Sequence, residues 1–178
     1  MEKSSPDPVH EPGIDLVLGH ASSGKSLWAE RLAFGMDWPL TYVATARVAD
    51  EEMRAKVARH VERRGPDWQL IEEETDLAGR CAAMPVQSTV LVDCATMWLT
   101  NLMMDGADWQ SPAEAWLAAM QDAPARFVVV SNDVGGGVTP DNALARAFQR
   151  AQGELNQRLA QAADRAFLVT AGLAQRLR

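Results

Sequence analysis

Residues 19–26 read "GHASSGKS", between an apolar run, "IDLVL", and a helix-forming run, "LWAERLAF". The stretch matches G-x-x-x-x-G-K-[ST], the Walker A pattern, in the strand-to-helix context that gives the pattern its mechanism. Gly19 and Gly24 permit the turn, while Lys25 would reach β- and γ-phosphate oxygens and Ser26 would ligate Mg²⁺. The alternative is a glycine-rich turn with an unrelated lysine, which the flanking strand and helix disfavour. The stretch therefore predicts a nucleoside triphosphate site, whose loop also contains His20, Ala21, Ser22 and Ser23.

Apolar, partly β-branched runs recur along the chain, and segments with helical spacing separate them. They read "IDLVLG", "TYVAT", "STVLVD", "RFVVVSN" and "RAFLVTAG". This alternation indicates an α/β domain with parallel strands, and continuous apolar strands indicate that helices cover both faces of the sheet. Together with the Walker A stretch, it predicts a three-layer P-loop NTPase (RecA-like) fold with a mainly parallel central sheet. Ligands of such sheets gather at the carboxyl ends of the strands, here Gly19, Thr45, Asp93 and Asn132.

The length and the first residues of the chain predict its domain organisation. A chain of 178 residues is long enough to bury one sizeable core. The opening "MEKSSPDPVHEPG" is polar, rich in proline and without periodicity. We therefore expect a flexible leader over residues 1–13 and a single nucleotide-binding domain over residues 14–178.

Charge and cysteine content exclude several classes of partner. A formal net charge of −7 and a pI near 4.9 argue against binding to nucleic acid or to an anionic membrane surface. No apolar run approaches the roughly 20 residues that span a bilayer. Two cysteines are too few for a disulfide framework, and no N-terminal signal pattern is visible. The chain is therefore expected in the cytoplasm.

Two long helices are expected from charge and apolar spacing. Residues 50–64 have acids in the first turn and arginines in the last, and a Gly-Pro pair follows them. Residues 140–163 have Pro140 near the first helical position and one apolar stripe, made of Leu144, Phe148, Gln152, Leu155 and Leu159. A second stripe, of Trp98, Leu99, Leu102 and Met103, is expected in the core or in a subunit contact.

Outside the Walker A stretch, three features could carry chemistry. Asp93 ends an apolar run, the position of an acid that holds Mg²⁺, although it could instead cap the helix that follows. His60 lies in the charged segment "KVARHVERR", where a solvated surface histidine is the simpler interpretation. The segment 131–142, "SNDVGGGVTPDN", has three consecutive glycines and indicates either a backbone that bends around a ligand or a plain flexible turn.

Several of these segments together resemble one family. They are "GHASSGKS", "YVATA", "DEEMRAKVARHVERRGPDW", "LVDCATMWLTNLM", "SNDVGGGVTPDNALARAFQRAQGELNQRLAQAAD" and "LVTAGL", in this order. The set resembles the bifunctional adenosylcobinamide kinase/adenosylcobinamide-phosphate guanylyltransferases of cobalamin biosynthesis, over nearly all the chain from Ile14. The resemblance implies phosphorylation of the corrinoid's aminopropanol hydroxyl with ATP or GTP. It further implies transfer of GMP from GTP to that phosphate through a guanylylated histidine, which is His60 in this sequence.

The resemblance also implies a set of binding residues and an assembly. The nucleotide contacts beyond residues 19–26 are Ala44, Thr45, Ala46, Val61, Glu62, Arg63, Arg64, Glu72 and Asp93. Lys25, His60 and Asp93 are the implied catalytic residues, and Ser26 and Asp93 the implied Mg²⁺ ligands. The family further implies a homotrimer in which a neighbouring subunit helps to complete each site.

The sequence departs from the family at three positions, and other functions fit part of it. Ser22 and Lys56 stand where arginine is usual, and Asp133 stands where many members have glutamate. These differences bear on substrate affinity more than on reaction type. A P-loop kinase of another small molecule would need Lys25 and Asp93 without His60, and a nucleotide-gated regulator would use the glycine loop as a switch.

Overall fold

The computed structural model describes residues 11–47 and 65–178. The helix expected over 50–64, with His60 and Val61 to Arg64, lies outside these residues, as do residues 1–10 of the expected leader. Within the described ranges, no helix is both long enough and apolar enough to cross a membrane.

A seven-stranded sheet forms the centre of the described domain, in the order β3-β2-β4-β5-β1-β6-β7. The strands are β1 (Gly13–Gly19), β2 (Leu40–Ala44), β3 (Trp68–Glu72), β4 (Thr89–Asp93), β5 (Arg126–Asn132), β6 (Arg165–Thr170) and β7 (Leu173–Arg176). All neighbouring pairs are parallel except β6 and β7, which are antiparallel. The predicted mainly parallel sheet is confirmed, with β3 and β7 as additional edge strands.

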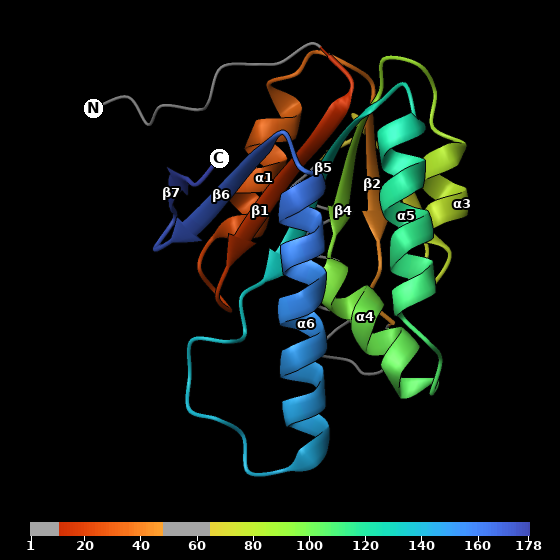
Figure 1. The fold of residues 1–178 in the computed structure, drawn as a ribbon. Coiled ribbons are helices and arrows are strands. Elements are labelled where there is room, and N and C mark those ends of the chain that lie inside the picture. Colours follow the sequence, from red (N-terminus) through yellow and green to blue (C-terminus); the bar gives the residue numbers. More distant parts are fainter. Residues whose placement is uncertain (1–10, 48–64) are drawn as a thin grey trace.

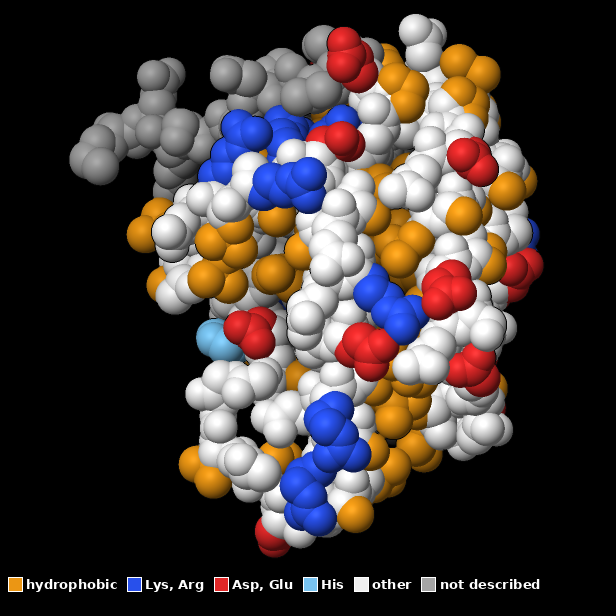
Figure 2. All heavy atoms as spheres, in the orientation of Figure 1, with side chains coloured by type: hydrophobic (Ala, Val, Ile, Leu, Met, Phe, Trp, Pro, Cys, Tyr) orange, Lys and Arg blue, Asp and Glu red, His pale blue; other side chains and the backbone are white. Residues whose placement is uncertain are grey.

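Helices cover both faces of this sheet, which confirms the three layers (Figure 1). The helices are α1 (Lys25–Phe34), α3 (Leu77–Ala82), α4 (Ala95–Met104), α5 (Gln110–Asp122) and α6 (Ala143–Ala162). Neighbouring residues of a strand point to opposite faces, so Val17 packs with α1 residues such as Leu32, whereas Leu16 packs with Trp98 and Leu155. On the face shown in Figure 2, acidic and basic side chains are interspersed.

The expected core stripe of α4 is confirmed. Trp98, Leu99 and Leu102 are buried, and Met103 is partly buried against the same cluster. The Trp98 ring lies 5.1 Å from that of Trp116 on α5, and its indole N–H donates to the Thr75 carbonyl at 2.8 Å. The buried tryptophan therefore has its polar group satisfied.

Helix α6 begins later than the sequence suggested. Asn142 is its N-cap and accepts a hydrogen bond from the Ala145 N–H at 2.7 Å, so the prediction that Pro140 lies near the first helical position is wrong. Of the predicted apolar stripe, Gln152, Leu155 and Leu159 are buried, whereas Leu144 in the first turn is 65% exposed.

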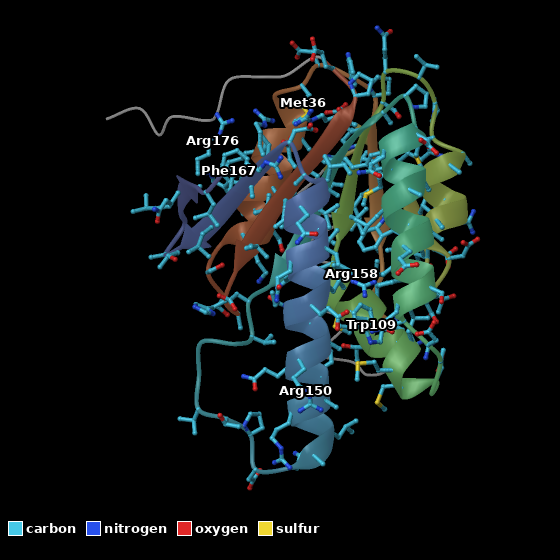
Figure 3. The ribbon with its side chains drawn as sticks, in the orientation of Figure 1. Met36, Trp109, Arg150, Arg158, Phe167 and Arg176 are labelled. Carbon is cyan, nitrogen blue, oxygen red and sulfur yellow. The ribbon has the colours of Figure 1, made fainter. Side chains whose placement is uncertain are left out.

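Arg158 attaches α6 to its neighbour α5 (Figure 3). Its guanidinium lies 5.3 Å from the centroid of the Trp109 ring, just before α5. The same group pairs with Glu154 at 2.6 Å and with Glu114 of α5 at 3.5 Å. A cation–π contact and two ion pairs thus converge on one side chain.

A buried ionic cluster joins the amino ends of three strands. The fully buried Asp15 carboxylate accepts hydrogen bonds from Arg126 of β5 at 2.5 and 3.1 Å and from Arg165 of β6 at 2.7 Å twice. Both arginines are themselves buried. Because burial removes water from each charged group, loss of one member of the cluster is expected to destabilise the fold strongly.

We predict that Asp15→Asn strongly destabilises the protein, since it removes the buried negative charge to which both buried guanidiniums donate hydrogen bonds. The free energy of unfolding should fall by about 3–5 kcal/mol. Urea unfolding followed by tryptophan fluorescence measures this change. Glu114→Gln removes a carboxylate whose side chain is 72% exposed, and should cost less than about 1 kcal/mol. Equal effects of the two substitutions would contradict the prediction.

Candidate nucleotide-binding site

The predicted phosphate-binding loop lies between strand β1 and helix α1, as expected. Gly19 is the last residue of β1, and Gly24 is the N-cap of α1 with φ of 90°. Ser22 also has a positive φ, of 57°, and the Ser23 N–H donates to the His20 carbonyl at 3.2 Å. The first α-helical bond runs from the Trp28 N–H to the Gly24 carbonyl. The N–H groups of the first turn therefore point out of the helix, where they can bind an anion.

Space favours glycine at position 19, and both the dihedral angle and limited space favour it at position 24. A Cβ on Gly19 would lie 2.4 Å from the Ser23 hydroxyl and 2.7 Å from the Val169 carbonyl oxygen. A Cβ on Gly24 would lie 3.1 Å from Cα of Gly172, in the turn between β6 and β7. The Gly172 N–H also donates to the Ser23 carbonyl at 2.7 Å. The β6–β7 turn, which the sequence did not bring to the site, supports the loop from one side.

Lys25 lies over this loop. Its ammonium donates a hydrogen bond to the His20 carbonyl at 3.1 Å, and its side chain is partly exposed. Ser26, the next residue, is also partly exposed on the first turn of α1. Both side chains are thus accessible at the end of the loop where the phosphates are expected.

Asp93 is the last residue of β4, and it is not a helix cap. Helix α4 has Cys94 as its N-cap, with no side-chain hydrogen bond at this end. One oxygen of the Asp93 carboxylate accepts from the Tyr42 hydroxyl at 2.9 Å. Burial, reinforced by the charge of Asp93, raises the pKa of the Cys94 thiol to about 11, so this cysteine is neutral at physiological pH.

Thr45 fastens the end of β2 to the end of β4. Its hydroxyl donates to the Cys94 carbonyl and accepts from the Cys94 N–H, each at 2.7 Å, and the residue is fully buried. The Asn101 amide of α4 donates to the Thr45 carbonyl at 2.8 Å. Thr45 was predicted to contact the nucleotide together with its neighbours Ala44 and Ala46, but its hydroxyl makes hydrogen bonds to the protein backbone. Asn101, which sequence reasoning missed, completes the arrangement.

A cluster of charges lies beside this connection, also missed in the sequence. The Arg47 guanidinium binds both carboxylate oxygens of Asp105, at 2.7 and 2.6 Å, and Glu74 at 2.6 Å. These partners hold the pKa of Arg47 above its usual value, and the hydrogen bonds from Arg47 hold that of Asp105 below its usual value. The cluster ties the end of α4 to the connections after β2 and β3. Glu72, a predicted contact, ends β3 and is exposed.

The strand register brings the predicted residues to one edge. Gly19 of β1 is paired with Asn132 of β5, and Ala44 of β2 is paired with Asp93 of β4. Strand β4 lies directly beside β5, where Asp93 is paired with Val130. The prediction that four strand ends meet at one edge is confirmed.

The oxygen donors at this edge are compatible with Mg²⁺, although they do not form a preformed cage. Ser26 offers a hydroxyl and Asp93 a carboxylate, ligand types that Mg²⁺ accepts together with water and phosphate oxygens. Among residues 11–47 and 65–178 there is no group of three His, Cys, Asp or Glu side chains able to hold a metal. Water and nucleotide oxygens would therefore complete the coordination of a magnesium ion held by Ser26 and Asp93.

Comparison with known proteins identifies the family. Residues 15–177 match the family model described as cobinamide kinase / cobinamide phosphate guanyltransferase. The chain belongs to this family. The bifunctional adenosylcobalamin biosynthesis protein CobP of Pseudomonas aeruginosa is 39% identical over 170 residues, 89% of this chain and 94% of that protein. The bifunctional adenosylcobalamin biosynthesis protein CobU of Escherichia coli is 35% identical over 179 residues, 92% of this chain and 98% of that protein.

As a member of the cobinamide kinase / cobinamide phosphate guanyltransferase family, the chain is an enzyme with two activities, a kinase and a guanylyltransferase. The family description names both activities, so it does not support the alternative of a P-loop kinase without a guanylyltransferase activity. A solved structure of flagellar accessory protein FlaH from Methanocaldococcus jannaschii has a TM-score of 0.56 at 11% identity, over 100% of this chain and 85% of that one. At this identity the likeness concerns the fold alone, and it agrees with the RecA-like architecture.

We predict that Gly24→Ala weakens nucleotide binding and destabilises the protein by about 1–2 kcal/mol, because alanine is strained at this φ and its methyl group meets the β6–β7 turn. Isothermal titration with ATP and a urea melt measure the two effects. Gly153→Ala, within α6 and with no atom near its Cβ, is the matched control and should gain about 0.5–1 kcal/mol. Unchanged ATP affinity in Gly24→Ala would contradict the loop geometry.

Proposed function

We propose that this enzyme first phosphorylates the aminopropanol hydroxyl of adenosylcobinamide, using ATP or GTP bound at the 19–26 loop. It then transfers GMP from GTP to adenosylcobinamide phosphate, giving adenosylcobinamide-GDP and pyrophosphate. The observation that carries this proposal is the placement of the loop, Lys25 and Asp93 at one sheet edge in a chain of this family.

In the kinase step, the loop and Lys25 hold the nucleotide phosphates. The N–H groups of the first turn of α1 point out of the helix toward the loop, and the Lys25 ammonium, now on the His20 carbonyl, is within reach of a phosphate bound there. The acceptor oxygen attacks the γ-phosphorus, the bond to the β-phosphate oxygen breaks, and ADP or GDP leaves. Ser26 and Asp93 would hold Mg²⁺, which neutralises phosphate charge when bound.

In the guanylyl step, His60 acts as the nucleophile. A neutral imidazole nitrogen forms a bond to the α-phosphorus of GTP, and the bond to pyrophosphate breaks. A phosphate oxygen of adenosylcobinamide phosphate then attacks the phosphoramidate and releases the histidine. The support is the family match, since His60 lies outside the described residues.

The remaining predicted contacts surround the same edge. Ala44 ends β2 and is followed by Thr45 and Ala46, and Glu72 ends β3. Thr45 would act through the position of Asp93. Val61 to Arg64 follow the histidine in the sequence. We further propose a homotrimer that completes each site across a subunit boundary, and a cytoplasmic location, which two buried free cysteines favour.

Lys25→Ala should abolish phosphorylation of adenosylcobinamide, because the charge that stabilises the transferring phosphoryl group is removed. We expect a loss of about 10²-fold or more in turnover. The assay follows adenosylcobinamide phosphate by chromatography. Near-normal turnover by this variant, with the fold intact, would refute the kinase assignment of the loop.

His60→Ala should separate the two activities. Phosphoryl transfer goes directly to the corrinoid hydroxyl, so adenosylcobinamide phosphate should still form. Guanylyl transfer should stop, because alanine offers no nucleophile. Mass spectrometry after GTP treatment should find one added GMP on the wild-type protein and none on the His60→Ala variant. Retention of both activities would disprove the guanylyl-histidine route, and loss of both would show that His60 also serves the kinase step.

A further inference from the structure

The side chain of His20 links the phosphate-binding loop to the glycine-rich connection of residues 133–142. Its Nδ1 lies 2.8 Å from the Asp133 carbonyl oxygen. A carbonyl oxygen only accepts hydrogen bonds, so Nδ1 carries the proton and donates it. The imidazole also lies against Gly136, where a Cβ would be 3.4 Å from Cε1 of the ring. His20 therefore contacts the connection at its root and in its glycine run.

The connection is held at both ends and exposed in the middle. At its start, the Asn132 N–H donates to the Thr96 hydroxyl oxygen at 2.8 Å, and the side-chain amide of Gln149 of α6 donates to the Val134 carbonyl at 3.1 Å. At its end, Arg146 donates to the carbonyls of residues 140 and 141. Residues 135–139 are exposed, and Val138 is 95% exposed. In Figure 2 the surface is hollowed between this connection and the first turns of α6.

The connection borders the loop at which the kinase step is proposed. It follows β5, the strand between β1, which leads to the phosphate-binding loop, and β4, which ends at Asp93. The Asp133 N–H donates to the Gly19 carbonyl at 3.1 Å, so the connection starts beside the loop itself. In an in-line transfer, the acceptor oxygen approaches the γ-phosphorus from the side opposite the β-phosphate. The connection begins at the carboxyl edge of β1 and β5, where Gly19 is paired with Asn132.

The chemistry of the exposed segment suits a corrinoid. A corrin ring carries a periphery of amide groups and apolar edges. Glycines leave backbone N–H and C=O groups open to amides, and Val138 adds an apolar contact. We propose that residues 133–142 form part of the corrinoid-binding surface, and that His20 is the positioning residue that holds this surface against the phosphate-binding loop. This inference rests on the proposed kinase function of that loop.

The test compares His20→Ala with His20→Asn in the full-length protein. Asparagine keeps an N–H donor near the position of Nδ1, whereas alanine removes it. For His20→Ala we expect the KM and the dissociation constant for adenosylcobinamide to rise about three- to tenfold, the equivalent of one neutral hydrogen bond. The dissociation constant comes from equilibrium dialysis with a non-hydrolysable ATP analogue present, using the visible absorption of the corrin. The loss of nucleotide affinity should be smaller than the loss of corrinoid affinity, and His20→Asn should recover most of the corrinoid affinity.

Three results would overturn the proposal: unchanged corrinoid affinity in His20→Ala, an equal loss of nucleotide and corrinoid affinity, or failure of asparagine to recover binding. Lys25→Ala, run in the same assay, separates this inference from the proposed function. If Lys25→Ala keeps its kinase turnover, the function of the loop is wrong. If Lys25→Ala is inactive while His20→Ala binds corrinoid normally, only the role of His20 is wrong. A thermal melt of each variant confirms that it is folded.

Discussion

The buried Asp15 carboxylate fixes the part of the sheet on which the nucleotide site depends. Asp15 of β1 is bound by Arg126 of β5 and Arg165 of β6, so the three adjacent strands share one ionic centre at their amino ends. If the pairing register of β5 or β6 against β1 shifted by one residue, the arginine of that strand would lose its contact with Asp15, and each apolar residue would turn to the opposite face of the sheet. The register in turn sets which residues meet at the carboxyl ends, where Gly19 is paired with Asn132.

At the carboxyl edge, neutral hydrogen bonds join the ends of β2 and β4, whereas ion pairs join β1, β5 and β6 at the amino edge. The hydroxyl of Thr45 satisfies both backbone groups of Cys94, and Asn101 satisfies the backbone of Thr45. Asp93 is thereby held between a fixed backbone and the Tyr42 hydroxyl. The charges of Arg47, Asp105 and Glu74 beside this connection pair with one another.

The sequence predicted the fold and the position of the 19–26 loop between a strand and a helix, because both depend on local patterns. Continuous apolar runs marked the buried strands, and the glycine spacing marked the phosphate-binding loop. Strand β3 was missed because it is an edge strand with exposed residues such as Leu70, and β7 because its residues are exposed throughout. The roles of Thr45 and Arg47 depend on partners about 30 to 60 positions away in the chain, which no local pattern contains. The start of α6 was misplaced because Pro140 and Asn142 are both common near helix starts, and the side chain of Asn142 makes the capping bond.

The contact between Gly24 and the β6–β7 turn has a consequence for protein engineering. Residues 19–26 look like a cassette that could be moved between scaffolds, since the consensus is short and its chemistry is carried mainly by backbone. Here, however, one wall of the loop is a different segment, which donates the Gly172 N–H to Ser23 and would make a tight contact with a methyl group on Gly24. If the loop were transferred to another protein, the β6–β7 turn would therefore have to be transferred with it. Substitutions in this turn should change the affinity for nucleotide without altering any residue of the consensus.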